Sequence, residues 1–129
     1  MSADVFSSKL ETRNSKLHKT QGMWPWVLQR VTGALLLLLL GLHFWVTHFG
    51  TTGAITFDKV VDRVRLPIWF HIDVALLAVI IYHALNGVRT IILDLGLTRK
   101  KALALDWGLV VLGLAMLAFG SWGLLPFRG

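Results

Sequence analysis

Residues 68–95 read IWFHIDVALLAVIIYHALNGVRTIILDL, an apolar run that is long enough to cross a bilayer as one helix. His83, Arg89 and Asp94 lie in or beside this run. Ionisable groups are costly inside a membrane and usually serve a function there. On a helix, His83 and Gly87 lie one turn apart on one face, and Asp94 returns to that face about three turns later. The stretch therefore predicts a membrane-spanning helix that carries a functional site.

Two interpretations of His83 follow from these residues. A neutral imidazole can offer a ring nitrogen to haem iron, and Gly87 leaves room for a planar cofactor beside it. Alternatively, His83 hydrogen-bonds to a neighbouring helix and Gly87 only permits close packing. The stretch alone leaves both interpretations open.

The composition of the whole chain is that of an integral membrane protein. Of 129 residues, 55% are hydrophobic and 16% are charged, and the mean hydropathy is +0.65. Because the chain has no cysteine, it carries no disulfide, thiolate metal site or iron–sulfur cluster, and redox chemistry needs a bound cofactor or a partner. The net charge is +6, but the basic residues form no face interleaved with aromatic residues. We therefore expect no nucleic-acid partner.

Apolar segments and their breaks divide the chain into three spans. We expect an all-α integral membrane protein with transmembrane helices at about 24–49, 68–95 and 106–125, in a single domain that covers residues 1–129. We expect the polar residues 1–22 to form a tail on the solvent side with one short helix. Residues 54–66 place apolar side chains among charges, which favours a short interfacial helix.

The distribution of basic residues predicts the orientation. With three spans, the tail and the segment 99–101 lie on one side of the membrane, and the segment 54–66 lies on the other. The first side carries seven basic residues, four in the tail and three at 99–101, and the second side carries three. Because basic residues favour the cytoplasmic side, we expect a cytoplasmic amino terminus and a carboxyl terminus outside.

The depth of each histidine in the membrane limits which ligands can share a metal. We take the inner boundary of the membrane core at Val27 on the first span and at Thr90 on the second. A rise of 1.5 Å per residue then puts His43 about 24 Å and His83 about 10.5 Å from this boundary, a difference of about 13.5 Å. Two nitrogen ligands of one iron lie only about 4 Å apart. If His83 binds haem, we therefore expect its second axial ligand to come from another chain and not from His43.

A second group of polar residues lies at the inner interface. Arg30 either extends to lipid phosphate or binds a ligand, because a guanidinium can hold a haem propionate or polarise a quinone carbonyl. Thr32 can add a hydroxyl and Trp26 can wall an apolar headgroup pocket. Arg89 and Asp94 approach the same interface from the helix at 68–95. These residues together predict a ligand site near the cytoplasmic surface.

Two motifs carry a resemblance to a known family. Arg30-Val31-Thr32-Gly33 at the start of one helix, with His83-Ala84-Leu85-Asn86-Gly87-Val88-Arg89 and Asp94 at the end of the next, resembles the membrane-anchor subunits of succinate:quinone oxidoreductases and fumarate reductases. The resemblance covers residues from about 22 to 97. The opening stretch Gly22-Met23-Trp24-Pro25-Trp26-Val27-Leu28-Gln29-Arg30 is most similar to the cytochrome b subunits of prokaryotic two-anchor enzymes. It implies half of a helical-bundle anchor that binds haem b and passes electrons from an iron–sulfur subunit to membrane quinone.

The resemblance also implies roles for single residues. His83 stands where the family has an axial haem ligand, and two-haem members have a second ligand at the position of His43, so these two are the expected metal ligands. Arg30 stands where the family has an arginine at the quinone site and the haem propionates. The residues expected to bind haem are His83, His43, Arg30 and Arg89. The residues expected to bind quinone are Arg30, Thr32, Trp26 and Asp94.

The cofactors and partners implied by the resemblance are one or two haem b groups shared with a second membrane-anchor subunit, quinone, a flavoprotein subunit and an iron–sulfur subunit. The location implied is the plasma membrane of a prokaryote. No residue of this chain is expected to act on succinate itself, so no catalytic residue is assigned for that reaction.

The sequence departs from some relatives in ways that leave two alternatives open. Trp26 replaces a quinone-contacting serine, Thr90 replaces a histidine after the Gly-x-Arg, and Leu95 replaces a tyrosine after the aspartate. Part of the quinone contacts is therefore expected from other subunits. One alternative is a structural anchor of the same complex without haem. The other is an unrelated small transporter or channel subunit with a polar path through its charged residues.

Overall fold

The computed structural model describes residues 3–20, 22–50 and 53–128 of this chain. In these ranges the chain is helical, with no strand, which confirms the expected all-α class. The helices are α1 (Ala3–Thr20), α2 (Met23–His48), α3 (Phe57–Arg65), α4 (Pro67–Asp94), α5 (Arg99–Leu124) and a terminal 3₁₀ turn, η1 (Leu125–Arg128).

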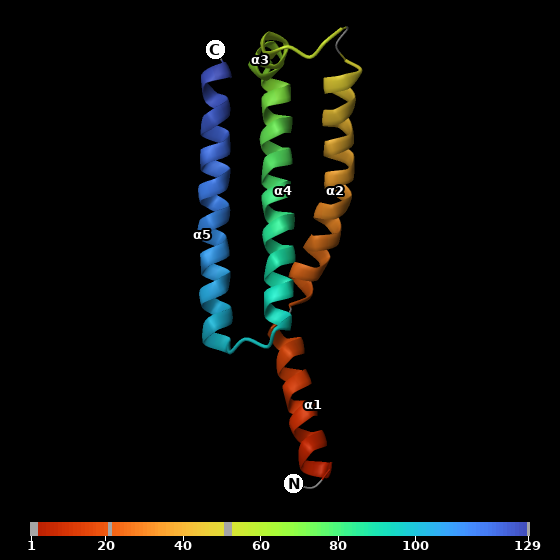
Figure 1. The fold of residues 1–129 in the computed structure, drawn as a ribbon, viewed down its shortest axis with the longest axis vertical. Coiled ribbons are helices and arrows are strands. Elements are labelled where there is room, and N and C mark those ends of the chain that lie inside the picture. Colours follow the sequence, from red (N-terminus) through yellow and green to blue (C-terminus); the bar gives the residue numbers. More distant parts are fainter. Residues whose placement is uncertain (1–2, 21, 51–52, 129) are drawn as a thin grey trace.

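Three helices run side by side, and α4 lies between α2 and α5 (Figure 1). In the described part of the chain, α2, α4 and α5 are the helices long and apolar enough to cross a membrane, so the expected number of three spans is confirmed. Helix α3 is seen end-on in Figure 1, across the end of the spans where the carboxyl terminus also lies, and it packs on α4 and η1. Helix α1 extends beyond the opposite end of the spans (Figure 1), and its 18 residues make it longer than the short helix expected in this tail.

The ends of the helices follow from local sequence. Pro67 occupies the first turn of α4, where its fixed φ suits a helix and its missing N–H costs nothing. Gly96, with a φ of 79°, turns the chain after α4, a conformation that glycine adopts without strain. Helix α5 begins at Arg99, earlier than the span expected from about 106. Hydropathy marks only the apolar part of this helix, and the good helix formers of residues 99–105 continue it into the polar interface.

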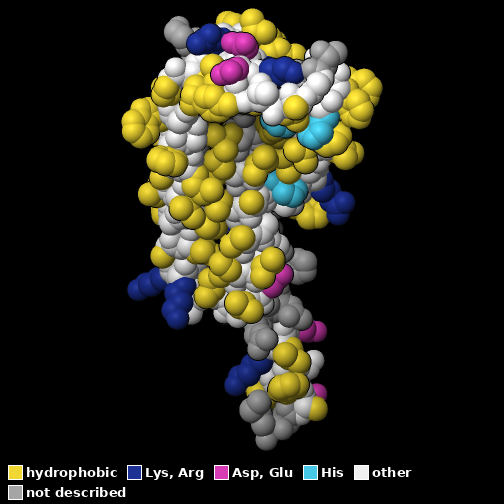
Figure 2. Space-filling model, turned by 45° about the horizontal axis from the view of Figure 1, so that its top comes forward, with side chains coloured by type: hydrophobic (Ala, Val, Ile, Leu, Met, Phe, Trp, Pro, Cys, Tyr) yellow, Lys and Arg dark blue, Asp and Glu magenta, His cyan; other side chains and the backbone are white. Residues whose placement is uncertain are grey.

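The spans carry few buried side chains and many outward-facing apolar ones. Leu37 is 79% exposed and Phe119 is 73% exposed. Figure 2 shows hydrophobic side chains spread over the spans, with Lys and Arg side chains near the ends of this apolar zone. The buried apolar residues are Val64, Phe70, Leu76, Ile81, Leu93 and Ala102, mostly on α4. Such outer surfaces suit contact with lipid or with further transmembrane helices.

Small residues bring α5 close to α4. A Cβ at Gly120 would lie 2.6 Å from Leu77 Cδ2, and a Cβ at Gly113 would lie 3.0 Å from Leu85 Cδ1. The two leucines of α4 therefore occupy the space that side chains would fill at these positions of α5. This is the close packing that glycine permits between membrane helices.

Candidate functional site

The imidazole of His83 lies against α2, where Thr32 holds it. The Thr32 hydroxyl lies 2.7 Å from the Leu28 carbonyl oxygen and 3.0 Å from His83 Nδ1. A hydroxyl has one proton, which goes to the nearby carbonyl, so the Thr32 oxygen is left to accept a hydrogen bond from Nδ1–H of His83. Assigned from this network, neutral His83 carries its proton on Nδ1 and a lone pair on Nε2.

Gln29 and Asn86 complete this contact between α2 and α4. Gln29 Nε2 lies 3.3 Å from His83 Nε2 and donates to the His83 carbonyl at 3.2 Å. Asn86 Nδ2 donates to Gln29 Oε1 at 2.7 Å and to the Pro25 carbonyl at 3.0 Å. His83 therefore hydrogen-bonds to a neighbouring helix, which is one of the two interpretations that the sequence leaves open.

Two glycines allow α2 and α4 to approach at this point. A Cβ at Gly33 would lie 3.4 Å from His83 Cε1, and a Cβ at Gly87 would lie 3.5 Å from Gln29 Nε2. From the sequence, Gly87 was expected to leave room for a cofactor beside His83. In the structure Gln29 of α2 lies there, and Gly33 is the glycine that lies against the imidazole.

Arg30 and Trp26 form a separate contact on the exposed side of α2. The guanidinium carbon of Arg30 lies 4.1 Å from the centre of the Trp26 ring, a cation–π distance. Both side chains are exposed, whereas Thr32 is buried. Asp94 is exposed at the last position of α4. Of the expected quinone residues, Arg30 and Trp26 are thus together, and Thr32 faces His83 instead.

Arg89 contacts Asp106 of α5 through two hydrogen bonds. Its Nε donates to Asp106 Oδ1 at 2.6 Å and its Nη2 donates to Oδ2 at 3.1 Å. Arg89 is therefore paired with α5. That Arg89 and Arg30 share one site stays a prediction. His83 and Arg89 are six residues apart on α4, which is not a multiple of a helical turn, so His83 faces α2 while Arg89 faces α5.

A groove of about 480 Å³ lies between α4 and α5 beside this ion pair. Most of its lining is apolar, and Tyr82, Asn86, Arg89 and Asp106 supply the polar groups. Its shape and chemistry suit an apolar chain with a polar group at one end. No sequence motif predicted the groove, because it depends on how two helices pack.

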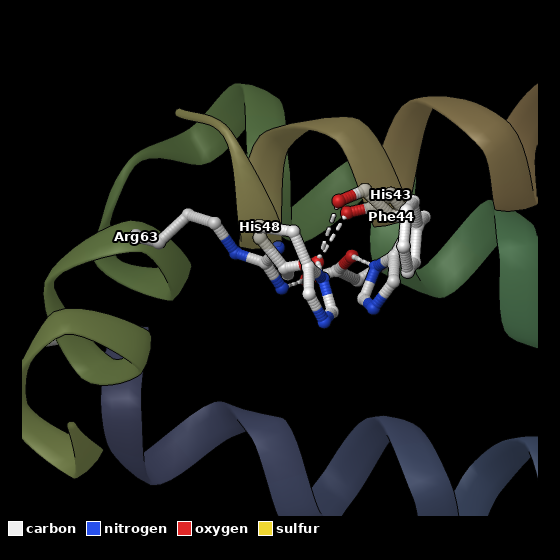
Figure 3. Close-up of polar contacts among 6 residues, drawn as sticks. His43, Phe44, His48 and Arg63 are labelled. Carbon is white, nitrogen blue, oxygen red and sulfur yellow. Dashed lines mark hydrogen bonds and ion pairs between the residues drawn. The ribbon is translucent and has the colours of Figure 1, made fainter. Parts of the chain in front are cut away.

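A second polar cluster lies near the other end of the spans, where α2, α3 and α4 meet. His43 Nδ1 lies 3.1 Å from Asp73 Oδ1, and Arg63 Nη2 donates to Asp73 Oδ2 at 2.9 Å. Figure 3 shows Arg63 extending from α3 towards this part of α2, with the rings of His43 and His48 on the same side. The side chains of Asp73 and Arg63 are 12% and 15% exposed, and that of His43 is 34% exposed.

The two candidate iron ligands lie far apart along the bundle. His43 contacts Asp73, and His83 follows Asp73 by ten residues on α4, a rise of about 15 Å. The structure therefore agrees with the depth difference calculated from the sequence, and His43 and His83 cannot bind one iron. The described residues also contain no group of three or more His, Asp or Glu side chains that could hold a metal ion. An iron site on this chain would be one that takes a single imidazole here.

Four residues of these contacts had no role predicted from the sequence: Gln29, Asp73, Asn86 and Asp106. A signal for Asp73 existed, because a carboxylate within an apolar span is costly and marks a functional or paired group. The partners of Gln29, Asn86 and Asp106 depend on which helix faces which, and the sequence does not give that information.

Comparison with known proteins identifies the family. The family model for the succinate dehydrogenase/fumarate reductase transmembrane subunit matches residues 7–121. Succinate dehydrogenase hydrophobic membrane anchor subunits are similar: that of Archaeoglobus fulgidus is 40% identical over 81 residues (61% of this chain, 69% of the relative). That of Thermoplasma acidophilum is 30% identical over 95 residues (72% of this chain, 76% of the relative).

A further relative is the succinate dehydrogenase 2 membrane subunit SdhC of Mycobacterium tuberculosis, which is 33% identical over 73 residues (57% of this chain, 54% of the relative). The family match includes all of α2 and α4, with the contacts around His83 and His43, and most of α5. The resemblance found in the two motifs is thus confirmed. This chain belongs to the succinate dehydrogenase/fumarate reductase transmembrane subunit family and is a membrane anchor subunit of that kind of complex.

Proposed function

We propose that this anchor binds haem b through His83, binds a second haem through His43, and helps to pass electrons from an iron–sulfur subunit to membrane quinone. Haem, when bound, supplies one-electron storage and relay between the soluble subunits and quinone. The partners in this proposal are a flavoprotein, an iron–sulfur subunit and a second membrane anchor, in the plasma membrane of a prokaryote with the amino terminus in the cytoplasm.

The observation that carries the proposal is the hydrogen bond between Thr32 and His83 Nδ1 at 3.0 Å. Haem iron binds the unprotonated nitrogen of a neutral imidazole, and a hydrogen bond donated by the other ring nitrogen fixes the tautomer. Thr32 supplies that hydrogen bond and leaves the lone pair on Nε2. The donor set therefore fits a nitrogen ligand that would hold haem iron, provided that the Gln29 amide moves away from Nε2.

Arg30 and Trp26 support a quinone site on the exposed side of α2. A guanidinium stabilises negative charge on a quinone oxygen as that oxygen is reduced, and the indole of Trp26 holds the guanidinium in place. The exposure of both side chains leaves them available to quinone and to a partner subunit. In this proposal Arg89 has a different role, because its guanidinium already binds Asp106.

One observation favours a second candidate, a structural anchor without haem. Both ring nitrogens of His83 already have polar neighbours within this chain, Thr32 and Gln29. A histidine with this environment also serves as a purely structural link between α2 and α4. The family assignment leaves no support for the alternative of an unrelated transporter or channel subunit.

The deciding experiment is a reduced-minus-oxidised spectrum of the purified complex, with haem per flavin measured for the native chain, His83→Ala and His43→Ala. We expect a b-type signal in the native complex and the loss of a different component in each variant. His48→Ala and His71→Ala are matched controls, because both imidazoles contact groups of their own helix at Thr47 and Pro67. These controls should keep the whole signal.

Each other outcome changes the proposal in a defined way. If only His83→Ala removes haem, the chain contributes one ligand to a single haem. If the native complex contains no haem, the structural anchor is correct and electrons pass from the iron–sulfur subunit directly to quinone.

A further inference from the structure

We infer that Asp73 positions His43, with Arg63 holding the carboxylate, so that Nε2 of His43 is presented as an iron ligand of increased basicity. This inference rests on the proposed function at His43 and adds to it a residue on α4 and a residue on α3. It starts from the two contacts of the Asp73 carboxylate, one to each neighbouring helix.

Asp73 fixes the tautomer of His43. A carboxylate is an acceptor only, so the short contact between Asp73 Oδ1 and His43 Nδ1, at 3.1 Å, places a proton on Nδ1. In the neutral ring Nε2 then carries the lone pair. Among the described residues, no hydrogen-bond partner of His43 Nε2 is found, in contrast to His83, whose Nε2 lies beside the Gln29 amide.

Arg63 balances the charge of Asp73. The carboxylate lies about 9 Å into α4 from Pro67, and its side chain is only 12% exposed. An ionised group in such a place needs a counter-charge, and Arg63 provides it at 2.9 Å from α3. Arg63 is itself largely buried, and its Nε lacks a hydrogen-bond partner among the described residues. The α3 helix therefore contributes a cation to a site that lies inside the bundle.

The charge of Asp73 would also affect how Nε2 of His43 binds iron. A carboxylate behind a ligating imidazole orients the ring and raises the basicity of the ligating nitrogen, more than a neutral acceptor does. Thr32 behind His83 is such a neutral acceptor. The two histidines thus differ in the charge of the group that orients them, although both have a proton on Nδ1.

The test uses the assembled complex with three variants of this chain, two single and one double. Asp73→Asn keeps an oxygen that can accept from Nδ1–H but removes the charge. Asp73→Leu removes both the charge and the acceptor. Because Asp73→Asn leaves Arg63 without its counter-charge, the double variant Asp73→Asn with Arg63→Gln is included to keep the site neutral.

We expect Asp73→Asn and the double variant to keep the haem that depends on His43 and to shift its midpoint potential to a more positive value. The low-spin ferric signal in electron paramagnetic resonance should shift with it. We expect Asp73→Leu to weaken haem binding at His43 by about 10- to 100-fold, the usual cost of losing such a supporting residue. The haem that depends on His83 should keep its potential in all three variants.

Asp62→Asn is the matched control, because Asp62 is an exposed aspartate of α3 whose contact is with Arg65 on the same helix, at 3.5 Å. This control should change neither the content nor the midpoint potential of either haem. If Asp73→Asn lowers only the stability of the complex and leaves the potential and the resonance signal of the His43 haem unchanged, Asp73 is a structural link and the inference is wrong.

Failure of the proposed function gives a different result. If His43→Ala leaves haem content and every potential unchanged, no haem is bound at His43, and both the second haem and the role of Asp73 are wrong. If His43→Ala removes a haem but the Asp73 variants behave as native, the second haem stands and only the inference about Asp73 is overturned.

Discussion

Arg89 and Asp106 join α4 to α5 through two parallel hydrogen bonds, of 2.6 and 3.1 Å. Removal of either side chain leaves the other charge in a partly buried place, 18% exposed for Arg89 and 35% for Asp106. We expect Arg89→Leu and Asp106→Leu each to lower the free energy of unfolding by about 1–2 kcal/mol, less than for a fully buried pair.

The double variant Arg89→Leu with Asp106→Leu distinguishes a pairing role from a ligand role. Because it removes both charges, unfolding of the complex in mixed detergent micelles should show most of the lost stability restored. Haem content should be native in all three variants. Loss of haem in Arg89→Leu but not in Asp106→Leu would indicate that Arg89 also binds a propionate.

Gly120 and Gly123 should respond in opposite ways to the same substitution. A Cβ at Gly120 would lie 2.6 Å from Leu77 Cδ2, whereas a Cβ at Gly123 meets nothing within 4 Å. Gly120→Ala should therefore cost about 1–3 kcal/mol, because the leucine must move out of a packed interface. Gly123→Ala should be neutral or stabilise α5 by up to about 1 kcal/mol. Equal effects in a micelle unfolding assay would contradict the packing of α4 against α5.

Gly33 should be sensitive to side-chain size because His83 lies against it. A Cβ there would be 3.4 Å from His83 Cε1, which leaves space for one methyl group but not for a branched side chain. We expect Gly33→Ala to keep the haem that depends on His83 and Gly33→Val to lose it, as measured by the reduced-minus-oxidised spectrum. Gly41→Val is the matched control in the same helix, since a Cβ at Gly41 meets nothing within 4 Å.

A substitution of Gln29 tests whether its amide supports His83 as an iron ligand or blocks Nε2 of His83. In this chain Gln29 Nε2 lies 3.3 Å from the nitrogen that would bind iron. If haem displaces this amide, Gln29→Leu should leave haem affinity unchanged or increase it, as judged by haem retention during dilution in detergent. Asn86→Leu is the companion variant, because Asn86 holds the Gln29 oxygen at 2.7 Å without touching the His83 ring nitrogens. Loss of haem in Gln29→Leu would show that the glutamine supports the ligand.

The fold followed from the sequence because membrane spans have a strong local signal. The apolar lengths placed α2 and α4 within about a residue of their observed ends, and Pro67 marked the start of α4. The depth of His43 relative to His83 also followed, since it depends only on the rise per residue of a straight helix. A short interfacial helix at α3 also followed, because the segment is charged and its nine helical residues are too few to cross a membrane.

The pairing of polar side chains did not follow, because it depends on how each helix is rotated about its axis. Arg89 was grouped with Arg30 by depth alone, and depth did not predict that its guanidinium pairs with Asp106 of α5. Thr32 was considered as a quinone contact, yet its hydroxyl holds His83. The three spans have broad apolar surfaces with little contrast between their faces, so the sequence contains weak information on rotation.

Arg30 gives the most direct test of quinone chemistry on this chain. Its guanidinium lies on Trp26 at the start of α2, and both side chains are exposed, so a substitution here should leave the packing of this chain unchanged. If Arg30 stabilises the negative charge that develops on a quinone oxygen, Arg30→Leu should slow succinate-driven quinone reduction on the order of 100-fold. Succinate oxidation with a soluble artificial acceptor should stay native, because that reaction bypasses the anchor. Arg65→Leu, at an exposed arginine on α3 near the other end of the spans, is the control and should leave both rates unchanged. Equal quinone reduction in the Arg30 and Arg65 variants would assign Arg30 to lipid phosphate and move the quinone site to a partner subunit.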